Sequence, residues 1–302
     1  MAASERVEIR SDALCASIDP LGAELRSLRT DAGHEIMWPG SAPWWERTSP
    51  ILFPVIGRLR DGRVAHRGRW LVMPPHGFAM HQPFECTDRQ ADACAWQLVA
   101  SDLTRAMYPF EFALRVGYRL HGRALTIQVA VENHGPGPMP FSLGLHPGFR
   151  WPIRAPTRDG HHLEFEAHEP APTRRRTASQ LLGPPVAALP MRERRLALND
   201  ALFAQGSHVL DTARSHWVRM SDHQGPLWQL DWTGLDQLAL WTQPGAPFIC
   251  VEPWAGRSEA DGEDADLEHR AASVQLEGGQ TFFARACFDV HASLCEDASR
   301  AG

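Results

Sequence analysis

The sequence lacks the local signatures of several common protein classes. Its six cysteines are scattered and include no CxxC pair, so neither a zinc ribbon nor a thioredoxin-type site is indicated. No GxSxG, Walker A or GxGxxG pattern occurs, which removes the usual motifs of serine hydrolases, P-loop enzymes and Rossmann enzymes. His76 and His81 are five residues apart with no glutamate between them, unlike the HExxH zinc motif. We therefore expect no metal site.

An excess of positive charge is also missing. Thirty Lys and Arg residues against 36 Asp and Glu residues give a net charge of −6, which disfavours nucleic acid and anionic membranes as partners. The least polar long stretch, residues 238–254, contains three prolines and Glu252, so no membrane-spanning helix of about 20 apolar residues is expected. The first residues show no apolar segment of a secretory signal, and we therefore expect a cytoplasmic protein with free thiols.

No long stretch repeats apolar residues at helical spacing, and alternation with period two dominates instead. Residues 112–120 and 125–131 alternate around a short glycine turn, which predicts a β-hairpin with one buried face. Residues 274–276 and 281–290 flank a Gly-Gly pair and predict a second hairpin. Further strands are expected at 24–29, 95–100, 216–220, 227–232 and 237–241. The pattern favours an all-β protein, a large antiparallel β-sandwich.

We expect one domain over residues 1–302, with its core at about 20–290, because no repeat or low-complexity linker divides the chain. Residues 154–199 hold several prolines and no clean period, so they are expected to form a long excursion from the sheet. The Arg174–Arg176 run within them is interpreted as a solvated loop face, with phosphate binding as the alternative.

Four polar residues stand in apolar, turn-bounded segments and are candidates for chemistry. Arg58 ends an apolar run, and His76 sits in a Pro-Pro-His-Gly loop; an exposed turn cation and a structural histidine are the simpler interpretations. His146 precedes a proline and has apolar neighbours that would tune its imidazole. Glu252 closes a nearly apolar strand, so it needs a strong partner or is a tuned acid–base group.

Five segments together resemble the aldose 1-epimerase (galactose mutarotase-like) family, in its bacterial LacX-like branch. They occur in family order and extend over most of the chain, while residues 154–236 match less clearly. The segments are PILFPVIGRLRDG at 50–62, HGFA at 76–79, YPFEF at 108–112, PFSLGLHPGF at 140–149 and FICVEPWAG at 248–256.

The resemblance implies a one-domain supersandwich that interconverts the α and β anomers of a free aldose without a cofactor. A monosaccharide is then the partner, and a homodimer is possible. Eleven Trp against two Tyr suit either ordinary packing or flat platforms for a sugar ring. The roles that the resemblance implies are Glu252 as general base, His146 as general acid, His76 and Arg58 as sugar-binding residues, Asp200 as the best counterpart of a sugar-binding aspartate, and Trp254 as the first stacking candidate.

The expected mechanism places a carboxylate and an imidazolium on opposite sides of the sugar ring. Glu252 and His146 should then face each other across a gap, and a closed salt bridge between them would suggest a structural pair. Three alternatives stay open. They are a hexose-6-phosphate mutarotase using Arg154, Arg158 or Arg174–Arg176, a non-catalytic sugar-binding protein of the same fold, and a glycoside hydrolase using Glu252 and Glu259.

Overall fold

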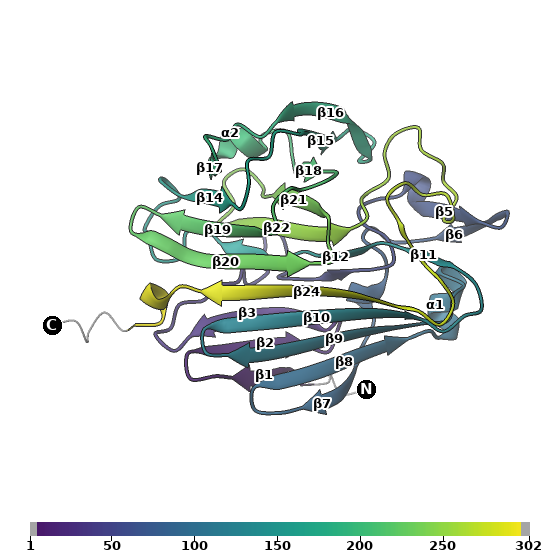
Figure 1. Cartoon of the computed structure of the whole chain (residues 1–302), viewed down its shortest axis with the longest axis horizontal. Coiled ribbons are helices and arrows are strands. Elements are labelled where there is room, and N and C mark those ends of the chain that lie inside the picture. Colours follow the sequence, from purple (N-terminus) through teal and green to yellow (C-terminus); the bar gives the residue numbers. More distant parts are fainter. Residues whose placement is uncertain (1–4, 297–302) are drawn as a thin grey trace.

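The computed structural model describes residues 5–296, and antiparallel strands make up most of that chain (Figure 1). The largest sheet has nine strands. Its strands, in spatial order, are β17 (Arg195–Ala197), β14 (His162–Phe165), β19 (Trp217–Asp222), β20 (Gly225–Thr233), β24 (Thr281–Val290), β10 (Ala124–Asn133), β9 (Phe112–His121), β8 (Ala93–Val99) and β7 (Glu85–Arg89).

The second sheet has eight strands and carries the residues of interest. Its strands, in order, are β16 (Leu182–Ala188), β15 (Pro172–Arg176), β18 (His208–Leu210), β21 (Gln237–Trp241), β22 (Phe248–Ala255), β12 (Leu143–Leu145) and β4 (Ile51–Leu52), with β13 (Gly148–Arg150) also paired to β22.

Smaller elements complete the described part of the chain. The N-terminal sheet consists of β1 (Val7–Arg10), β2 (Leu14–Asp19) and β3 (Glu24–Thr30), and two strand pairs are β5 (Arg63–His66) with β6 (Arg69–Val72) and β11 (Met139–Phe141) with β23 (Val274–Leu276). The helices are α1 (Asp102–Met107), α2 (Asp200–Phe203) and the short 3₁₀ turns η1 (Arg60–Gly62), η2 (Ala79–His81) and η3 (Ala292–Leu294).

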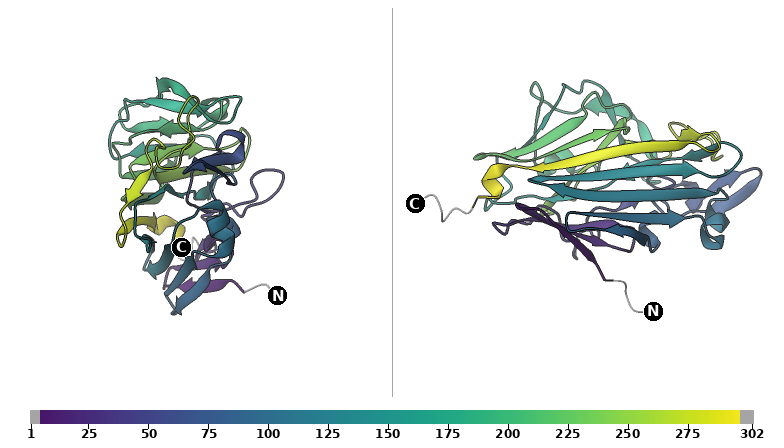
Figure 2. Two further views of the ribbon diagram at one scale, coloured as in Figure 1. Left: turned by 90° about the vertical axis from the view of Figure 1, so that its right-hand side faces the viewer. Right: turned by 60° about the horizontal axis from the view of Figure 1, so that its bottom comes forward.

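The eight-stranded and N-terminal sheets pack against the large one, as the alternation of side chains requires. Phe149 of β13 stacks on Trp228 of β20 with ring centroids 3.9 Å apart, which joins the eight-stranded sheet to the nine-stranded sheet. The N-terminal strands lie against β8 and β9 (Figure 2), where Tyr118 donates to the carbonyl of Ala23 at 2.7 Å. One hydrophobic core extends from Val7 to Leu294, so buried residues begin before position 20.

The hairpin at 112–131 is confirmed, because β9 and β10 pair from Phe112↔Asn133 to His121↔Ala124. The other strands expected at 24–29, 95–100, 216–220, 227–232 and 237–241 correspond to β3, β8, β19, β20 and β21. All six cysteines are free thiols. No helix among residues 5–296 is long and apolar enough to cross a membrane.

The hairpin expected at 274–290 is wrong. β23 pairs with β11, while β24 pairs with β10 and β20. Gly278 lets the chain pass close to another loop, since a Cβ there would lie 2.6 Å from the carbonyl oxygen of Gly135. The Gly-Gly pair does form a tight turn, in which the N–H of Gln280 donates to the carbonyl of Glu277 at 3.1 Å, but the turn leads from one sheet to another and does not join a hairpin.

The excursion expected at 154–199 is also wrong, because this segment supplies edge strands to both large sheets. β14 and β17 end the nine-stranded sheet, and β15 and β16 end the eight-stranded one. The register between β15 and β16 shifts twice. Such irregular edge strands carry no clean alternation, which explains why the sequence pattern did not reveal them.

Candidate active site

Strand β22 divides its side chains between the core and the outer face of the eight-stranded sheet. Ile249, Val251 and Ala255 belong to the main hydrophobic core. Side chains alternate along a strand, so Cys250 and Glu252 point to the opposite face. Two small apolar clusters lie on that face, one containing Cys250 and Phe248, the other Trp254 and Ala239. Glu252 is therefore a carboxylate set between two apolar patches.

His146 and Glu252 are in direct contact. Nε2 of His146 lies 3.3 Å from Oε2 of Glu252, and the residues are 6% and 2% exposed. His146 follows β12, which pairs with β22 through Gly144↔Trp254, and this pairing brings the two residues together. The gap expected between them is thus absent, and no ring can lie between the groups in this arrangement. The contact is the closed ion pair that would suggest a structural role, so a catalytic role is left to the proposal below.

Tryptophan rings surround the imidazole of His146. Trp45 stacks on it with centroids 4.6 Å apart and an interplanar angle of 26°, and Trp241 meets it edge-on at 5.8 Å. Both tryptophans keep part of their surface exposed. By contrast Trp254 is only 3% exposed, which leaves little ring surface for a ligand. The flat walls beside the pair come from Trp45 and Trp241.

His76 lies beside His146, with ring centroids 5.7 Å apart. The backbone N–H of Gly57 donates to Nδ1 of His76 at 3.2 Å, so the neutral ring carries its proton on Nε2. Burial, with the charges of Arg176 and Arg58, lowers the pKa of His76 to about 3. His76 is therefore a neutral hydrogen-bond donor at neutral pH.

Arg176, which the sequence offered only within a run of three arginines as a possible phosphate-binding group, lies near the His146–Glu252 pair. In the register of the eight-stranded sheet, Arg174, Val209, Ala239 and Glu252 are successive cross-strand neighbours, and Arg176 is two residues further along β15. It therefore points to the same face as Glu252. The side chain is solvent-accessible, yet burial lowers its pKa while the charge of Glu252 raises it. Arg176 is thus an accessible cation close enough to Glu252 for the two charges to interact.

The side chains of Arg58 and Arg176 make no hydrogen bond or ion pair with any of residues 5–296. Three of the arginines considered for a phosphate site are engaged: Arg154 binds Asp222 at 2.9 Å, Arg158 binds Asp200 at 2.6 Å and Arg174 binds Asp211 at 2.6 Å. The interpretation of Arg174–Arg176 as a loop face is wrong for all three, because they lie on strand β15, where Arg176 is solvent-exposed.

Burial pushes both members of the central pair toward their neutral forms. It raises the pKa of Glu252 well above its usual value, opposed by the charge of Arg176. It lowers the pKa of His146 well below its usual value, helped by the charges of His76 and Arg176. The Trp254 side chain favours the Glu252 anion, although its buried indole N–H makes no hydrogen bond of normal geometry. These directions favour a carboxyl that carries the proton beside a neutral imidazole, with Nε2 and Oε2 3.3 Å apart.

Asp200 is placed away from these contacts. Its carboxylate accepts from Nη2 of Arg158 at 2.6 and 2.7 Å and from the backbone N–H of Gly245 at 2.9 Å. The bond to Gly245 and the contacts with Arg158 lower its pKa. These contacts tie α2 to the loop between β21 and β22, and none of them involves His76, His146 or Glu252.

Among residues 5–296, one cluster offers donors for a metal ion: His146, Cys250 and Glu252, whose ligand atoms lie within 4.8 Å of one another. Cys, His and Glu are zinc ligands. The cationic Arg176 is close enough to influence Glu252 and His146, which opposes a divalent cation there. The residues present therefore suit proton transfer better than metal binding.

Trp45 and Trp241 had no distinguishing local signal in the sequence, and Arg176 stood out only as one of three consecutive arginines. Trp45 stands in a loop, and Arg176 ends a run of three arginines on an irregular strand. His146, Glu252 and His76 are confirmed as spatial neighbours, and Arg58 influences the pKa of His76.

Comparison with known proteins identifies the family and the fold. A family model described as aldose 1-epimerase matches residues 5–263. The chain is 26% identical to the plasmid-encoded protein LacX of Lactococcus lactis subsp. lactis, over 87% of this chain and 92% of that protein. A galactose mutarotase-like protein from Lactobacillus casei superposes with a TM-score of 0.87 at 27% identity, covering 95% of this chain and all of that one. A galactose mutarotase related enzyme from Lactobacillus acidophilus gives 0.86 at 25% identity, covering 95% and 97%.

Proposed function

The chain belongs to the aldose 1-epimerase family, and we propose that it interconverts the α and β anomers of an aldose by acid–base ring opening and reclosure. The observation that carries this proposal is the buried His146–Glu252 pair, 3.3 Å apart, beside half-exposed tryptophan rings. A buried pair sharing one proton can give a proton to one oxygen and take a proton from another.

A catalytic role requires this contact to open when the sugar binds, because nothing can lie between groups 3.3 Å apart. In a cyclic aldose the anomeric hydroxyl and the ring oxygen are bonded to the same carbon, so the acid and the base must reach neighbouring atoms. They need not bracket the ring. A sugar approaching from the accessible side would insert these two oxygens between Nε2 of His146 and the carboxylate of Glu252.

Ring opening then proceeds with a balanced transfer of protons. The reacting form of the pair has Glu252 ionised and His146 protonated. Arg176 favours the Glu252 anion, whereas burial opposes both charges and Arg176 opposes the imidazolium, so in this scheme the proton passes from Glu252 to His146 when the sugar binds. Glu252 removes the proton of the anomeric hydroxyl, the C1–O5 bond breaks, and His146 protonates the ring oxygen. Rotation about C1–C2 exposes the other face of the aldehyde. Reclosure reverses both transfers and restores the pair.

The neighbours of the pair position the sugar in this scheme. His76 donates from Nε2, because Nδ1 accepts from Gly57. Trp45 and Trp241 supply apolar surfaces for C–H faces of the ring, and Arg58 donates to hydroxyls. The glycoside hydrolase alternative is weaker, because Glu259 is held by Arg270 at 3.3 Å and by Arg60 at 3.6 Å.

A second candidate function is mutarotation of a phosphorylated or otherwise anionic sugar. The observation that favours it is the unpartnered guanidinium of Arg176 on the same face as Glu252. Charge-assisted hydrogen bonds from Arg58 and Arg176 suit a phosphate.

Polarimetry tests both candidates. Freshly dissolved α-glucose, α-galactose and glucose 6-phosphate are each followed with and without the protein, against spontaneous mutarotation. We expect accelerated decay of rotation for at least one sugar, and the preferred sugar identifies the substrate class. Sugar binding by calorimetry with no acceleration for any aldose would contradict the enzyme and favour a binding protein of this fold.

A further inference from the structure

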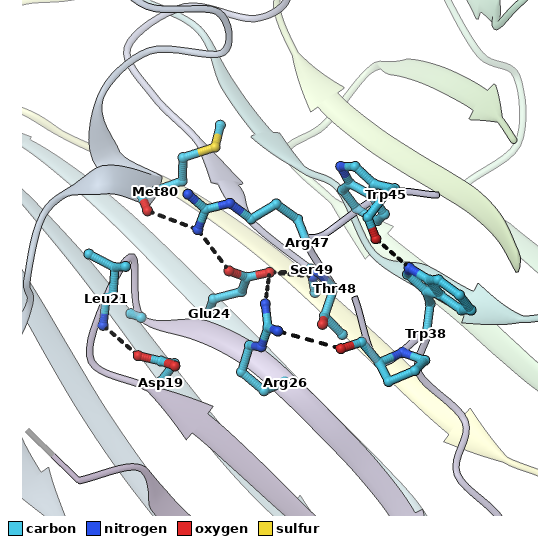
Figure 3. Close-up of polar contacts among 12 residues, drawn as sticks. Asp19, Leu21, Glu24, Arg26, Trp38, Trp45, Arg47, Thr48, Ser49 and Met80 are labelled. Atoms are coloured by element: carbon cyan, nitrogen blue, oxygen red, sulfur yellow. Dashed lines mark hydrogen bonds and ion pairs between the residues drawn. The ribbon is translucent and has the colours of Figure 1, made fainter. Parts of the chain in front are cut away.

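Glu24 is a buried carboxylate that the proposed acid–base chemistry does not use. It begins strand β3 and is 1% exposed. Its Oε1 accepts from the backbone N–H groups of Thr48 at 2.7 Å and Ser49 at 3.1 Å, and from Nη1 of Arg26 at 3.2 Å (Figure 3). Its Oε2 accepts from Nη1 of Arg47 at 3.2 Å. The carboxylate thus ties β3 to segment 47–49.

Segment 45–50 in turn holds the strand end that carries His146. The carbonyl of Pro50 accepts from the backbone N–H of His146 at 3.2 Å, and the carbonyl of Thr48 accepts from Gly148 at 2.8 Å. Trp45 of the same segment stacks on the imidazole of His146. A Cβ on Gly148 would lie 2.8 Å from the Trp45 ring, so the fit between the two segments is close.

A second set of contacts, made by Arg47, connects Glu24 to the segment that follows His76. The guanidinium of Arg47 also donates to the carbonyl of Met80 at 3.3 Å and lies 3.2 Å from Nδ1 of His81 (Figure 3 shows the contact with Met80). Met80 and His81 both belong to η2 and lie four and five residues after His76. One network therefore reaches the chain segments of both site histidines.

A buried carboxylate tolerates only arrangements in which its partners are all in place, because an unpaired charge is costly to bury. We propose that Glu24 is a positioning residue of the active site, which fixes segment 45–50 and thereby the stacking of Trp45 on His146. The consequence for turnover rests on the proposed mutarotase function. Misplacing a catalytic group by about 1 Å lowers the rate by up to about 10²-fold.

The chain offers a matched control in Glu169. This carboxylate is also fully buried and accepts from backbone N–H groups, those of Arg214 at 3.0 Å and Ser215 at 2.8 Å. None of its contacts involves segment 45–50 or the histidines of the site. Glu24→Gln and Glu169→Gln therefore remove the same charge from comparable backbone contacts, one connected to the site and one not.

The experiment measures kcat, KM and the imidazole ring-proton NMR resonances of His146 in the full-length protein. The His146 signals are identified by their loss in His146→Asn and report the stacked Trp45 ring whether or not the protein is active. We expect Glu24→Gln to lower kcat about tenfold with a smaller change in KM, and to shift the His146 resonances. Glu169→Gln should leave kcat and these resonances near their parent values.

A second variant tests the same network in case Glu24→Gln does not fold. Arg47→Lys keeps a positive charge but has a single nitrogen, so it cannot reproduce the contacts that Nη1 makes with Glu24 and Nη2 makes with His81, and it should shift the His146 resonances in the same direction. Equal losses of kcat in Glu24→Gln and Glu169→Gln, or unmoved His146 resonances in the folded Glu24 variant, would overturn the proposal. An inactive parent protein would refute the mutarotase function instead, and the NMR comparison would still decide whether Glu24 positions His146.

Discussion

Replacing Gly77 by alanine tests how the loop that presents His76 is held. Gly77 has φ = +76°, and a Cβ there would lie 2.1 Å from the carbonyl oxygen and 2.4 Å from the carbonyl carbon of Phe53. Phe53 is fully buried, and its carbonyl accepts from both Phe78 and Ala79. The carbonyl cannot move away without breaking these hydrogen bonds, so the added methyl group must displace the His76 loop.

Two costs add at this position. A non-glycine residue in the left-handed region costs about 1–2 kcal/mol. Forcing an extra methyl group into a packed interior costs about 1–3 kcal/mol more. Gly68 separates the costs, because it has φ = +75° and an added Cβ there would meet nothing within 4 Å. Gly68→Ala should therefore show only the first cost, and Gly77→Ala the sum of both.

The assay is urea unfolding followed by circular dichroism, together with polarimetric turnover of each folded variant. We expect the free energy of unfolding to fall further in Gly77→Ala than in Gly68→Ala by about 1–3 kcal/mol. Turnover should drop only in Gly77→Ala, since His76 adjoins that residue. Equal destabilisation by the two substitutions would refute the close approach of this loop to Phe53.

Three further predictions concern charge. Burial and the charges of His76 and Arg176 lower the pKa of His146, so turnover should persist as pH falls through 6.5; a pH–rate profile with its acid limb centred at that value would contradict this. The pKa of His76 is about 3 in the folded protein and 6.5 for a histidine in the unfolded chain, so unfolding takes up a proton between these values. The free energy of unfolding should therefore decline as pH falls through this window, by up to about 1.4 kcal/mol per pH unit from His76 alone. The decline should be shallower in His76→Gln, and equal slopes in urea titrations of the two proteins would exclude this contribution. Finally, if glucose 6-phosphate is a substrate, Arg176→Met should raise its KM about tenfold or more relative to that of glucose; parallel changes for both sugars would show that Arg176 does not bind phosphate.

The sequence predicted those parts of the fold that have a local pattern. Residues 112–131 alternate because one face of β9 and β10 is buried, and this pattern survives in the structure. The pairing of β23 with β11 depends on where the chain goes after Asn133, which no local window contains. Strand β15 carries register shifts and a mixed burial pattern, so its membership in the eight-stranded sheet left no periodic signal.

In the candidate site, too, local patterns pointed to single residues, whereas the contacts between them depend on tertiary structure. Glu252 was conspicuous as a carboxylate closing an apolar strand, and a buried carboxylate requires a partner. That its partner is His146 follows from the pairing of β12 with β22. The expected gap was wrong because the pairing of β12 with β22 places His146 directly against Glu252, a tertiary contact that the residue pattern does not show. Trp45 belongs to the site because its ring stacks on His146, a tertiary contact that the residue pattern does not show.

The most direct test of the account is the turnover of Glu252→Gln, measured by polarimetry on the sugar that the parent protein accelerates. The substitution keeps the size of the side chain and removes the base, so the variant should fold, as judged by circular dichroism. Its anomer exchange should be slower than that of the parent by at least about 10²-fold, the lower end of what a positioned general base contributes. A folded Glu252→Gln protein that exchanges anomers at the parent rate would contradict the acid–base pair at the centre of this account.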